Sequence, residues 1–91
     1  MYKKGSKSGT TRFSVKADKG AREVLLAGDF TNWAPVRMKK AKTGSFGVTL
    51  AIPRGSHEYK FIVDGCWVTD PDNAAYAANP YGTVNSLLRV E

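Results

Sequence analysis

The sequence predicts an all-β domain, an antiparallel sandwich or small barrel, and three observations support this prediction. Apolar and polar residues alternate with a period of two along several short runs. Glycine, proline, asparagine and aspartate gather between those runs, where turns are expected. No long window repeats its apolar residues at the spacing of an amphipathic helix. A chain of 91 residues is long enough for one such domain.

The N-terminal part divides into a leader and two strands. Residues 1–9 combine glycine, serine and lysine and are expected to form a flexible basic tail, which places the folded domain at 10–91. Alternation predicts strands over Thr10–Ala17 and Arg22–Phe30, joined by a turn at Asp18–Gly20. In the second strand the apolar residues in phase on one side are Val24, Leu26 and Phe30.

The middle of the chain gives the clearest alternation. The pattern breaks over Thr31–Val36, and a short basic segment around Met38 follows. Strands are predicted over Phe46–Ile52 and Glu58–Val63, with a turn at Pro53–Gly55 between them. In the later strand, Tyr59, Phe61 and Val63 face one way, whereas Glu58, Lys60 and Ile62 face the other.

The C-terminal part holds one tight turn, one long loop and a closing strand. Asp64 and Gly65 form a strong turn signal that leads into a short strand over Cys66–Val68. The polar segment Asp70–Tyr81 is predicted to be a long loop, within which Ala74–Ala78 could form one turn of helix. Alternation over Val84–Val90 then closes the domain.

The net charge of +6 is concentrated at the N-terminus, where Lys3, Lys4, Lys7 and Arg12 precede the first acidic residue. We therefore interpret the basic tail as a solvated segment and expect no nucleic-acid partner.

No apolar run approaches the length of a membrane-spanning helix. The single cysteine excludes an intrachain disulfide, and we expect a cytoplasmic protein. No role is assigned to the lysines at 39, 40 and 42.

The sequence offers little for catalysis, and we expect that the chain is not an enzyme and needs no cofactor or metal. The only histidine, His57, is expected to be an ordinary surface residue, and nothing indicates that it meets Cys66. Phosphate-binding glycine motifs are absent. The aspartates that flank turns are expected to cap the backbone rather than to face each other across a deep cleft. These are Asp29, Asp64, Asp70 and Asp72.

The aromatic residues separate into a core set and two exceptions. The residues in phase with the apolar faces are Phe13, Phe30, Phe46, Tyr59 and Phe61. Trp33 lies in the polar segment that breaks the strand pattern, and Trp67 follows the Asp64–Gly65 turn. Such loop indoles either cover an end of the sandwich or bind a partner.

Two polar residues favour a sugar as that partner. Lys60 and Asn85 are each predicted to face away from the core. Pyranose rings pack their apolar faces on indoles, and their hydroxyls need donors and acceptors of the kind that lysine and asparagine supply.

Four segments, in order, resemble the signature of family 48 carbohydrate-binding modules. They are Val24–Trp33 (VLLAGDFTNW), Gly55–Trp67 (GSHEYKFIVDGCW), Asp70–Pro71 and Tyr81–Ser86 (YGTVNS). This family includes the glycogen-binding domain of the AMP-activated protein kinase β subunit and the N-terminal early-set domains of isoamylases and glycogen branching enzymes. The resemblance extends from about Arg12 to Val90.

The resemblance implies an immunoglobulin-like β-sandwich that binds α-1,4-glucan, in glycogen, starch or maltooligosaccharides. It implies that Trp33 and Trp67 stack on glucose rings, and that Lys60, Thr83 and Asn85 bind hydroxyls. Tyr81 stands where kinase-type modules carry a leucine, and a tyrosine there would offer a third stacking surface. A glucan-metabolising enzyme or a kinase is a further partner that the resemblance implies.

Two alternatives use the same fold. The domain could serve as an immunoglobulin-like docking module for a glucan-metabolising enzyme or a kinase, although a docking domain has little need of two loop tryptophans beside outward polar groups. Single-stranded nucleic acid could bind the basic tail and the exposed aromatics, but the positive charge lies away from the tryptophans.

Overall fold

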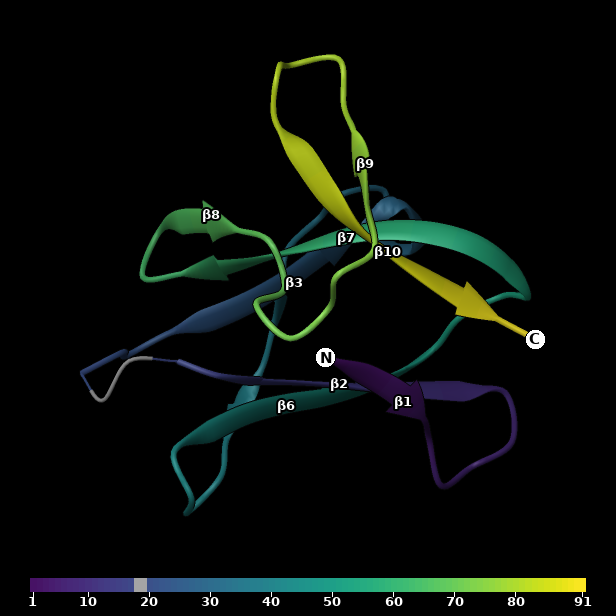
Figure 1. Ribbon diagram of the computed structural model, residues 1–91. Coiled ribbons are helices and arrows are strands. Elements are labelled where there is room, and N and C mark those ends of the chain that lie inside the picture. Colours follow the sequence, from purple (N-terminus) through teal and green to yellow (C-terminus); the bar gives the residue numbers. More distant parts are fainter. Residues whose placement is uncertain (18–19) are drawn as a thin grey trace.

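Two antiparallel β-sheets pack face to face in the computed structural model, which describes residues 1–17 and 20–91 (Figure 1). The smaller sheet has the strand order β1-β2-β6-β5, and the larger has β4-β3-β7-β10-β9 with β8 paired to β7. The strands are β1 (Tyr2–Lys4), β2 (Thr10–Lys16), β3 (Val24–Gly28), β4 (Val36–Arg37), β5 (Lys39–Lys40), β6 (Ser45–Ala51), β7 (Gly55–Val63), β8 (Cys66–Val68), β9 (Tyr76–Ala78) and β10 (Val84–Val90). A short 3-10 turn, η1 (Asp29–Thr31), follows β3. The predicted antiparallel sandwich is confirmed.

The long strands pair at the centre of each sheet. In the smaller sheet β2 pairs with β6, so that Phe13 lies opposite Val48. In the larger sheet β7 pairs with β3 on one side and β10 on the other, and Tyr59 lies opposite both Gly28 and Ser86. This register places every second residue of β7 toward the smaller sheet. None of the described residues forms a helix long and apolar enough to cross a membrane.

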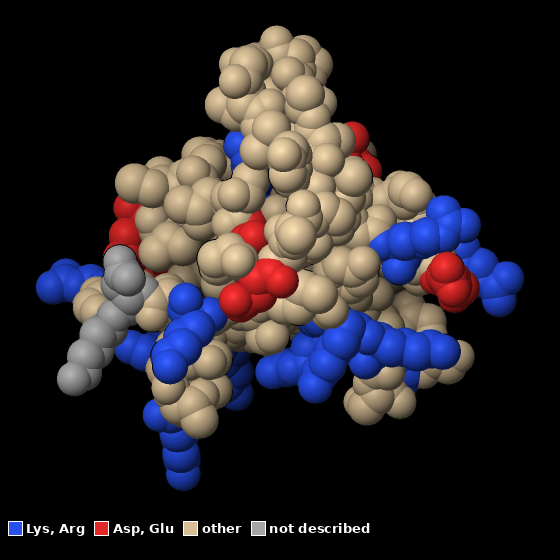
Figure 2. Space-filling view, in the orientation of Figure 1, with Lys and Arg blue, Asp and Glu red and all other residues tan. Residues whose placement is uncertain are grey.

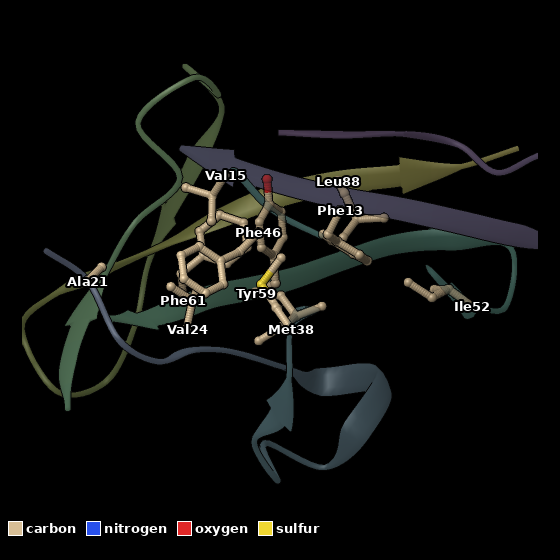
Figure 3. Packing of buried hydrophobic residues seen from close by; sticks show 11 residues of the cluster. Phe13, Val15, Ala21, Val24, Met38, Phe46, Ile52, Tyr59, Phe61 and Leu88 are labelled. Carbon is tan, nitrogen blue, oxygen red and sulfur yellow. The ribbon is translucent and has the colours of Figure 1, made fainter. Parts of the chain in front are cut away.

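The core lies between the sheets and is rich in aromatic residues (Figure 3). Phe13, Tyr59 and Phe61 are fully buried. Their rings meet edge to face, with centroids 5.2 Å apart for Phe13 and Tyr59 and 5.7 Å apart for Tyr59 and Phe61. Phe46 is also buried, and Phe30 is partly buried against the cluster, so the predicted core aromatics are confirmed.

A buried polar network secures the middle of β7 to the loop before β9. The Tyr59 hydroxyl donates to Asp70 Oδ2 at 2.6 Å, and the Asp70 backbone N–H donates to Ser86 Oγ at 2.8 Å. Asn73 Nδ2 donates to the same Tyr59 hydroxyl and to the Leu87 carbonyl. The amino nitrogen of Met1 lies 2.6 Å from Asp70 Oδ2. Because each buried polar group has a partner, the network fixes this loop against the core at little cost in desolvation.

The structure differs from the sequence prediction in several places. Tyr2–Lys4 form a strand paired with β2, inside the segment expected to be a flexible tail. Tyr76–Ala78 form a strand paired with β10, where the alanines suggested a helical turn. The strand expected over Arg22–Phe30 is shorter, because the chain turns at η1. The basic segment around Met38 forms two short edge strands.

Asp18 and Lys19, from the predicted turn, lie outside the described residues.

Candidate functional site

A groove of about 760 Å³ lies on the larger sheet, and we call it the aromatic groove. Its lining residues are Asp29, Trp33, Glu58, Lys60, Trp67, Ala78, Asn79, Pro80, Tyr81, Thr83 and Asn85. The β7–β8 hairpin and the β9–β10 loop, which supply part of this lining, both stand on the side of the larger sheet away from the smaller one (Figure 1). All six residues predicted to bind a ligand line this groove.

Lys60 reaches the groove because of strand alternation in β7. Its neighbours Tyr59 and Phe61 point into the core and are fully buried, so Lys60 points to the opposite face. Its cross-strand partner on β3 is Ala27, a small residue that is itself fully buried. The prediction that Lys60 faces outward is confirmed.

Trp67 is positioned by a tight hairpin turn. Asp64 and Gly65 have φ values of 48° and 86°, and Val63 pairs directly with Cys66, which are the features of a type I′ hairpin. The turn places Trp67 opposite Ile62, on the same face of the sheet as Lys60. The indole is 50% exposed, so one of its surfaces is free to pack against a ligand.

Trp33 is held in a backbone conformation that non-glycine residues rarely adopt. Asn32 and Trp33 have φ values of 55° and 61°. The Trp33 N–H donates to the Gly28 carbonyl at 2.8 Å, and the Thr31 hydroxyl donates to the same carbonyl at 2.9 Å. The Gly28 N–H in turn donates to Thr31 Oγ1. These bonds hold the half-buried indole at the edge of the groove.

Asn79 organises the β9–β10 loop. Its Oδ1 accepts hydrogen bonds from the backbone N–H groups of Tyr81 and Thr83, at 3.0 and 3.2 Å. Its Nδ2 donates to Thr83 Oγ1 at 2.6 Å and to Asn85 Oδ1 at 3.1 Å. One side chain therefore fixes three predicted site residues. Tyr81 lies at the tip and is 89% exposed.

Asn85 forms the floor of the groove. It lies on the outer face as predicted, but it is only 7% exposed, and its Nδ2 donates to Glu58 Oε1 at 3.0 Å. With Asn79 bonded to its other side-chain atom, half of its four hydrogen-bonding positions are already used. Asn85 therefore orients its neighbours at least as much as it meets a ligand.

Lys60 and Thr83 retain polar capacity that a ligand could use. Lys60 Nζ donates to Thr83 Oγ1 at 3.1 Å, which among the described residues uses one of three ammonium protons. Thr83 Oγ1 accepts from both Lys60 and Asn79, so its own proton is directed elsewhere. The groove thus presents at least two donors between exposed aromatic rings.

His57 is more than an ordinary surface residue. Its Nδ1 lies 2.7 Å from Asp29 Oδ1, its Nε2 lies 2.8 Å from the Pro53 carbonyl, and its ring stacks on Phe30 at 5.9 Å. Both ring nitrogens therefore face acceptors, an arrangement that suits the imidazolium. Partial burial lowers the pKa of His57, but the hydrogen bonds to Asp29 and Pro53 and the charge of Asp29 outweigh it and raise the pKa above its usual value.

Three of the four aspartates at the turns, Asp29, Asp64 and Asp70, have structural partners for their carboxylates. Asp29 Oδ2 accepts the Glu58 N–H at 2.9 Å, so this residue joins η1 to β7. Asp64 Oδ1 accepts the N–H groups of Arg22 and Glu23. Cys66 is exposed and His57 is bonded elsewhere, so the structure does not bring these two together. Within residues 1–17 and 20–91, no three His, Cys, Asp or Glu side chains gather as metal ligands.

Sequence analysis missed five lining residues of the groove, Asp29, Glu58, Ala78, Asn79 and Pro80, of which Asp29, Glu58 and Asn79 carry polar side chains. Glu58 shares the outward face of its strand with Lys60, and this alternation could have identified it. Asn79 precedes Pro80 in a turn-like segment, which signals a loop but not the contacts across it. Asp29 meets β7 only through the packing of η1, which no sequence pattern reveals.

Comparison with known proteins gives the groove a family context. Residues 11–91 match the family described as "Glycogen recognition site of AMP-activated protein kinase". The chain is 38% identical over 72 residues to the β-1 subunit of 5′-AMP-activated protein kinase from Sus scrofa, a match that covers 79% of this chain and 57% of that protein. It is 35% identical over 77 residues to the β-2 subunit from Homo sapiens, covering 85% of this chain and 28% of that protein. The chain therefore spans between about a quarter and somewhat over half of these relatives.

Solved structures extend the likeness to parts of an amylase and a pullulanase. A maltogenic amylase from S. marinus matches with a TM-score of 0.82 at 26% identity, over 100% of this chain and 16% of the amylase. A pullulanase mutant from Paenibacillus barengoltzii, complexed with maltotetraose, matches with a TM-score of 0.58 at 27% identity, over 88% of this chain and 13% of the pullulanase. Since the family match spans nearly the whole sequence, this chain belongs to the family of glycogen recognition sites of AMP-activated protein kinase.

Proposed function

We propose that this domain is a non-catalytic module that binds α-1,4-glucan in the aromatic groove, with Trp33 and Trp67 stacking on glucose rings. One observation carries the proposal: three aromatic residues from three separate loops or hairpins line one groove together with the donors Lys60 and Thr83. Both features are what a pyranose chain needs, because its ring faces are apolar and its edges carry hydroxyls.

The relatives support the same ligand class. The matched family is named for glycogen recognition, and a pullulanase with this fold was crystallised with maltotetraose. A non-catalytic role is supported by the carboxylates of the groove. Asp29 and Glu58 both line it, yet each already accepts a hydrogen bond that holds the fold together.

In the proposed complex, a glucan chain lies across the sheet with successive rings against Trp33 and Trp67. Lys60 donates to ring hydroxyls through its remaining protons, and Thr83 donates through its hydroxyl. Tyr81, at the tip of the β9–β10 loop, offers a third aromatic surface. Each hydroxyl contact replaces one with water, so we expect a dissociation constant of roughly micromolar to millimolar, about −8 to −4 kcal/mol.

The test is a titration of ¹⁵N-labelled protein with maltoheptaose while the indole N–H signals are followed. The sequence holds two tryptophans, so each signal can be assigned with one variant. Both signals should move with maltoheptaose and stay in place with cellohexaose, whose β-linked chain has a different curvature. Trp33→Ala and Trp67→Ala should each weaken binding by about tenfold or more, on the order of 1.5 kcal/mol.

Tyr76→Ala is the matched control. Tyr76 is 65% exposed on β9 but does not line the groove, so its loss removes an exposed aromatic ring and should leave glucan binding unchanged. If neither indole signal moves at millimolar maltoheptaose, the proposal is wrong. The same fold would then be better explained as a docking module, as its place within a much longer amylase chain allows.

A further inference from the structure

A second hollow, of about 400 Å³, lies among positively charged side chains and shares no residue with the aromatic groove. We call it the basic hollow. Its lining residues are Arg12, Arg37, Lys39, Lys40, Ala41, Gly47 and Val48. Four of these seven residues are cationic and none is acidic. Figure 2 shows that lysine and arginine side chains are most frequent on the smaller-sheet side of the molecule, whereas the β9–β10 end carries few.

The chain between the two sheets brings these cations together. Val36–Arg37 form the edge strand β4 of the larger sheet, and Lys39–Lys40 form the edge strand β5 of the smaller one. Met38 between them is buried, and its N–H donates to the Val24 carbonyl at 2.9 Å. Because Met38 points inward, its neighbours Arg37 and Lys39 are exposed on the outside of the sandwich.

Gly47 shapes the floor of the hollow. It lies within β6, between Ser14 of β2 and Lys39 of β5, at a position where most strands carry a side chain. A Cβ atom at Gly47 would lie 2.5 Å from Arg12 Nη2, so the guanidinium occupies the space that the glycine leaves. Glycine inside a strand weakens it and often marks a close approach by a ligand or another group. Here the glycine lets Arg12 lie close to the sheet.

Arg12 is also held by a hydrogen bond but not by an acid. Its Nη1 donates to Thr49 Oγ1 at 3.2 Å, across the β2–β6 pair. Lys40 is positioned as well, with its Nζ 5.8 Å from the centre of the Phe46 ring. Among the described residues, no carboxylate forms an ion pair with any of the four cations of the hollow. The result is a concentration of positive charge with unused donors.

We propose that the basic hollow binds the phosphate group of a small phosphorylated sugar. A guanidinium presents paired N–H groups that match two oxygens of a phosphate, and lysines add point charges around it. The hollow is several times larger than a phosphate ion needs, which leaves room for a small carrier. None of the described residues that line it is aromatic, so they offer no stacking surface for a nucleotide base, and a hydroxylated sugar is the carrier we infer.

The experiment is a titration of the ¹⁵N-labelled protein with glucose 6-phosphate at constant ionic strength. The amide signals of Lys39, Lys40, Ala41 and Gly47 should shift and saturate, while the indole signals of Trp33 and Trp67 stay in place. Glucose alone should leave the amide signals of the hollow unchanged. Because the two sites share no residue, failure of this titration and failure of maltoheptaose binding are separate results.

Two variants sharpen the test. Gly47→Ala should weaken glucose 6-phosphate binding by about tenfold, because the new Cβ displaces the Arg12 guanidinium without removing any charge. Alanine also suits a strand better than glycine, so folding should be kept. Arg12→Gln should weaken binding similarly. Arg54→Gln removes one positive charge from an exposed turn outside the hollow and should change binding by less than about twofold.

Titrations with inorganic phosphate and with AMP identify which part of the ligand the basic hollow recognises. Binding of glucose 6-phosphate that is tighter than binding of inorganic phosphate and of AMP supports the proposal. Equal binding of inorganic phosphate overturns the sugar part, and tighter binding of AMP overturns it in favour of a nucleotide. No saturable shift at millimolar glucose 6-phosphate, or equal losses in Arg54→Gln and Gly47→Ala, overturns the site itself.

Discussion

At the scale of single residues, the aromatic groove depends on side chains whose positions are fixed by hydrogen bonds. Asn32 and Trp33 occupy the left-handed region, which costs on the order of 1 to 2 kcal/mol for each residue. The bonds from Trp33 and Thr31 to the Gly28 carbonyl offset this cost. The indole is therefore positioned before any ligand arrives, which reduces the entropy lost on binding.

His57 should make stability depend on pH. Its pKa in the folded protein is raised above the unfolded value of 6.5, so the imidazolium is stabilised by folding. This contribution is fully present below the unfolded pKa and is lost as the pH rises through the higher, folded pKa. The free energy of unfolding of the wild type should therefore exceed that of His57→Gln by more at about pH 5.5 than at about pH 8.5.

Urea denaturation at the two pH values measures this difference. The groups that face His57 are the Asp29 carboxylate, the Pro53 carbonyl and the Phe30 ring. If the free energies of unfolding of the wild type and His57→Gln differed by the same amount at both pH values, His57 would not be the source of the pH dependence.

At the scale of elements, each wall of the aromatic groove belongs to a turn that a few residues define. The β7–β8 hairpin needs positive φ values at Asp64 and Gly65, and the β9–β10 loop is organised by Asn79. The turn η1 packs tightly against β7, with Asp29 Oδ2 accepting the Glu58 N–H. The groove therefore consists of preformed turns on a rigid sheet, an arrangement common in binding modules.

Gly28, where β3 meets η1, is the most sensitive point of that arrangement. A Cβ atom there would lie 2.4 Å from Phe30 Cε2 and 2.8 Å from the Glu58 carbonyl oxygen. Gly28→Ala should therefore lower the free energy of unfolding by about 1 to 3 kcal/mol and shift the indole signal of Trp33. Gly20→Ala, which places its Cβ in open space, should leave both quantities nearly unchanged. Equal stabilities of the two variants in urea would refute this account.

At the scale of the whole molecule, the two sheets are joined by a short segment whose side chains point alternately into the core and out to the surface. Met38 is 3% exposed and belongs to the core cluster, whereas Arg37 and Lys39 on either side line the basic hollow. Packing of one residue thus sets the position of the cations next to it. The two candidate sites are built on different elements, so each can be changed without the other.

Met38→Ala should reveal how much this segment contributes to holding the sandwich together. Removing a buried side chain of this size leaves a cavity between the sheets, and the free energy of unfolding should fall by about 2 to 5 kcal/mol. Lys42→Ala, an exposed neighbour, should change it by no more than about 0.5 kcal/mol. Thermal and urea denaturation measure both variants. A loss for Met38→Ala as small as that of the control would show that the segment is peripheral.

Strand alternation predicted much of the site as well as of the fold. The outward positions of Lys60 and Asn85 follow from the period of two in their strands, and the hairpin before Trp67 follows from its Asp-Gly turn. Local propensity predicted the wrong secondary structure where pairing with a neighbouring strand determines it. The alanines before Asn79 favour helix in isolation, but Tyr76–Ala78 bond to β10 and extend the larger sheet. Tyr2–Lys4 likewise become a strand because β2 offers them a free edge.

The sequence by itself determined the all-β class and the aromatic core, because alternation and turn chemistry are local properties of the chain. Its resemblance to family 48 carbohydrate-binding modules, rather than any periodicity, indicated the full set of six residues proposed to bind glucan. Only the tertiary structure decided which distant side chains meet. Asp29 reaching His57 and Glu58, and Arg12 lying over Gly47, depend on packing between elements far apart in sequence. Such contacts arise from the register and stacking of the sheets, for which no local pattern carries a signal.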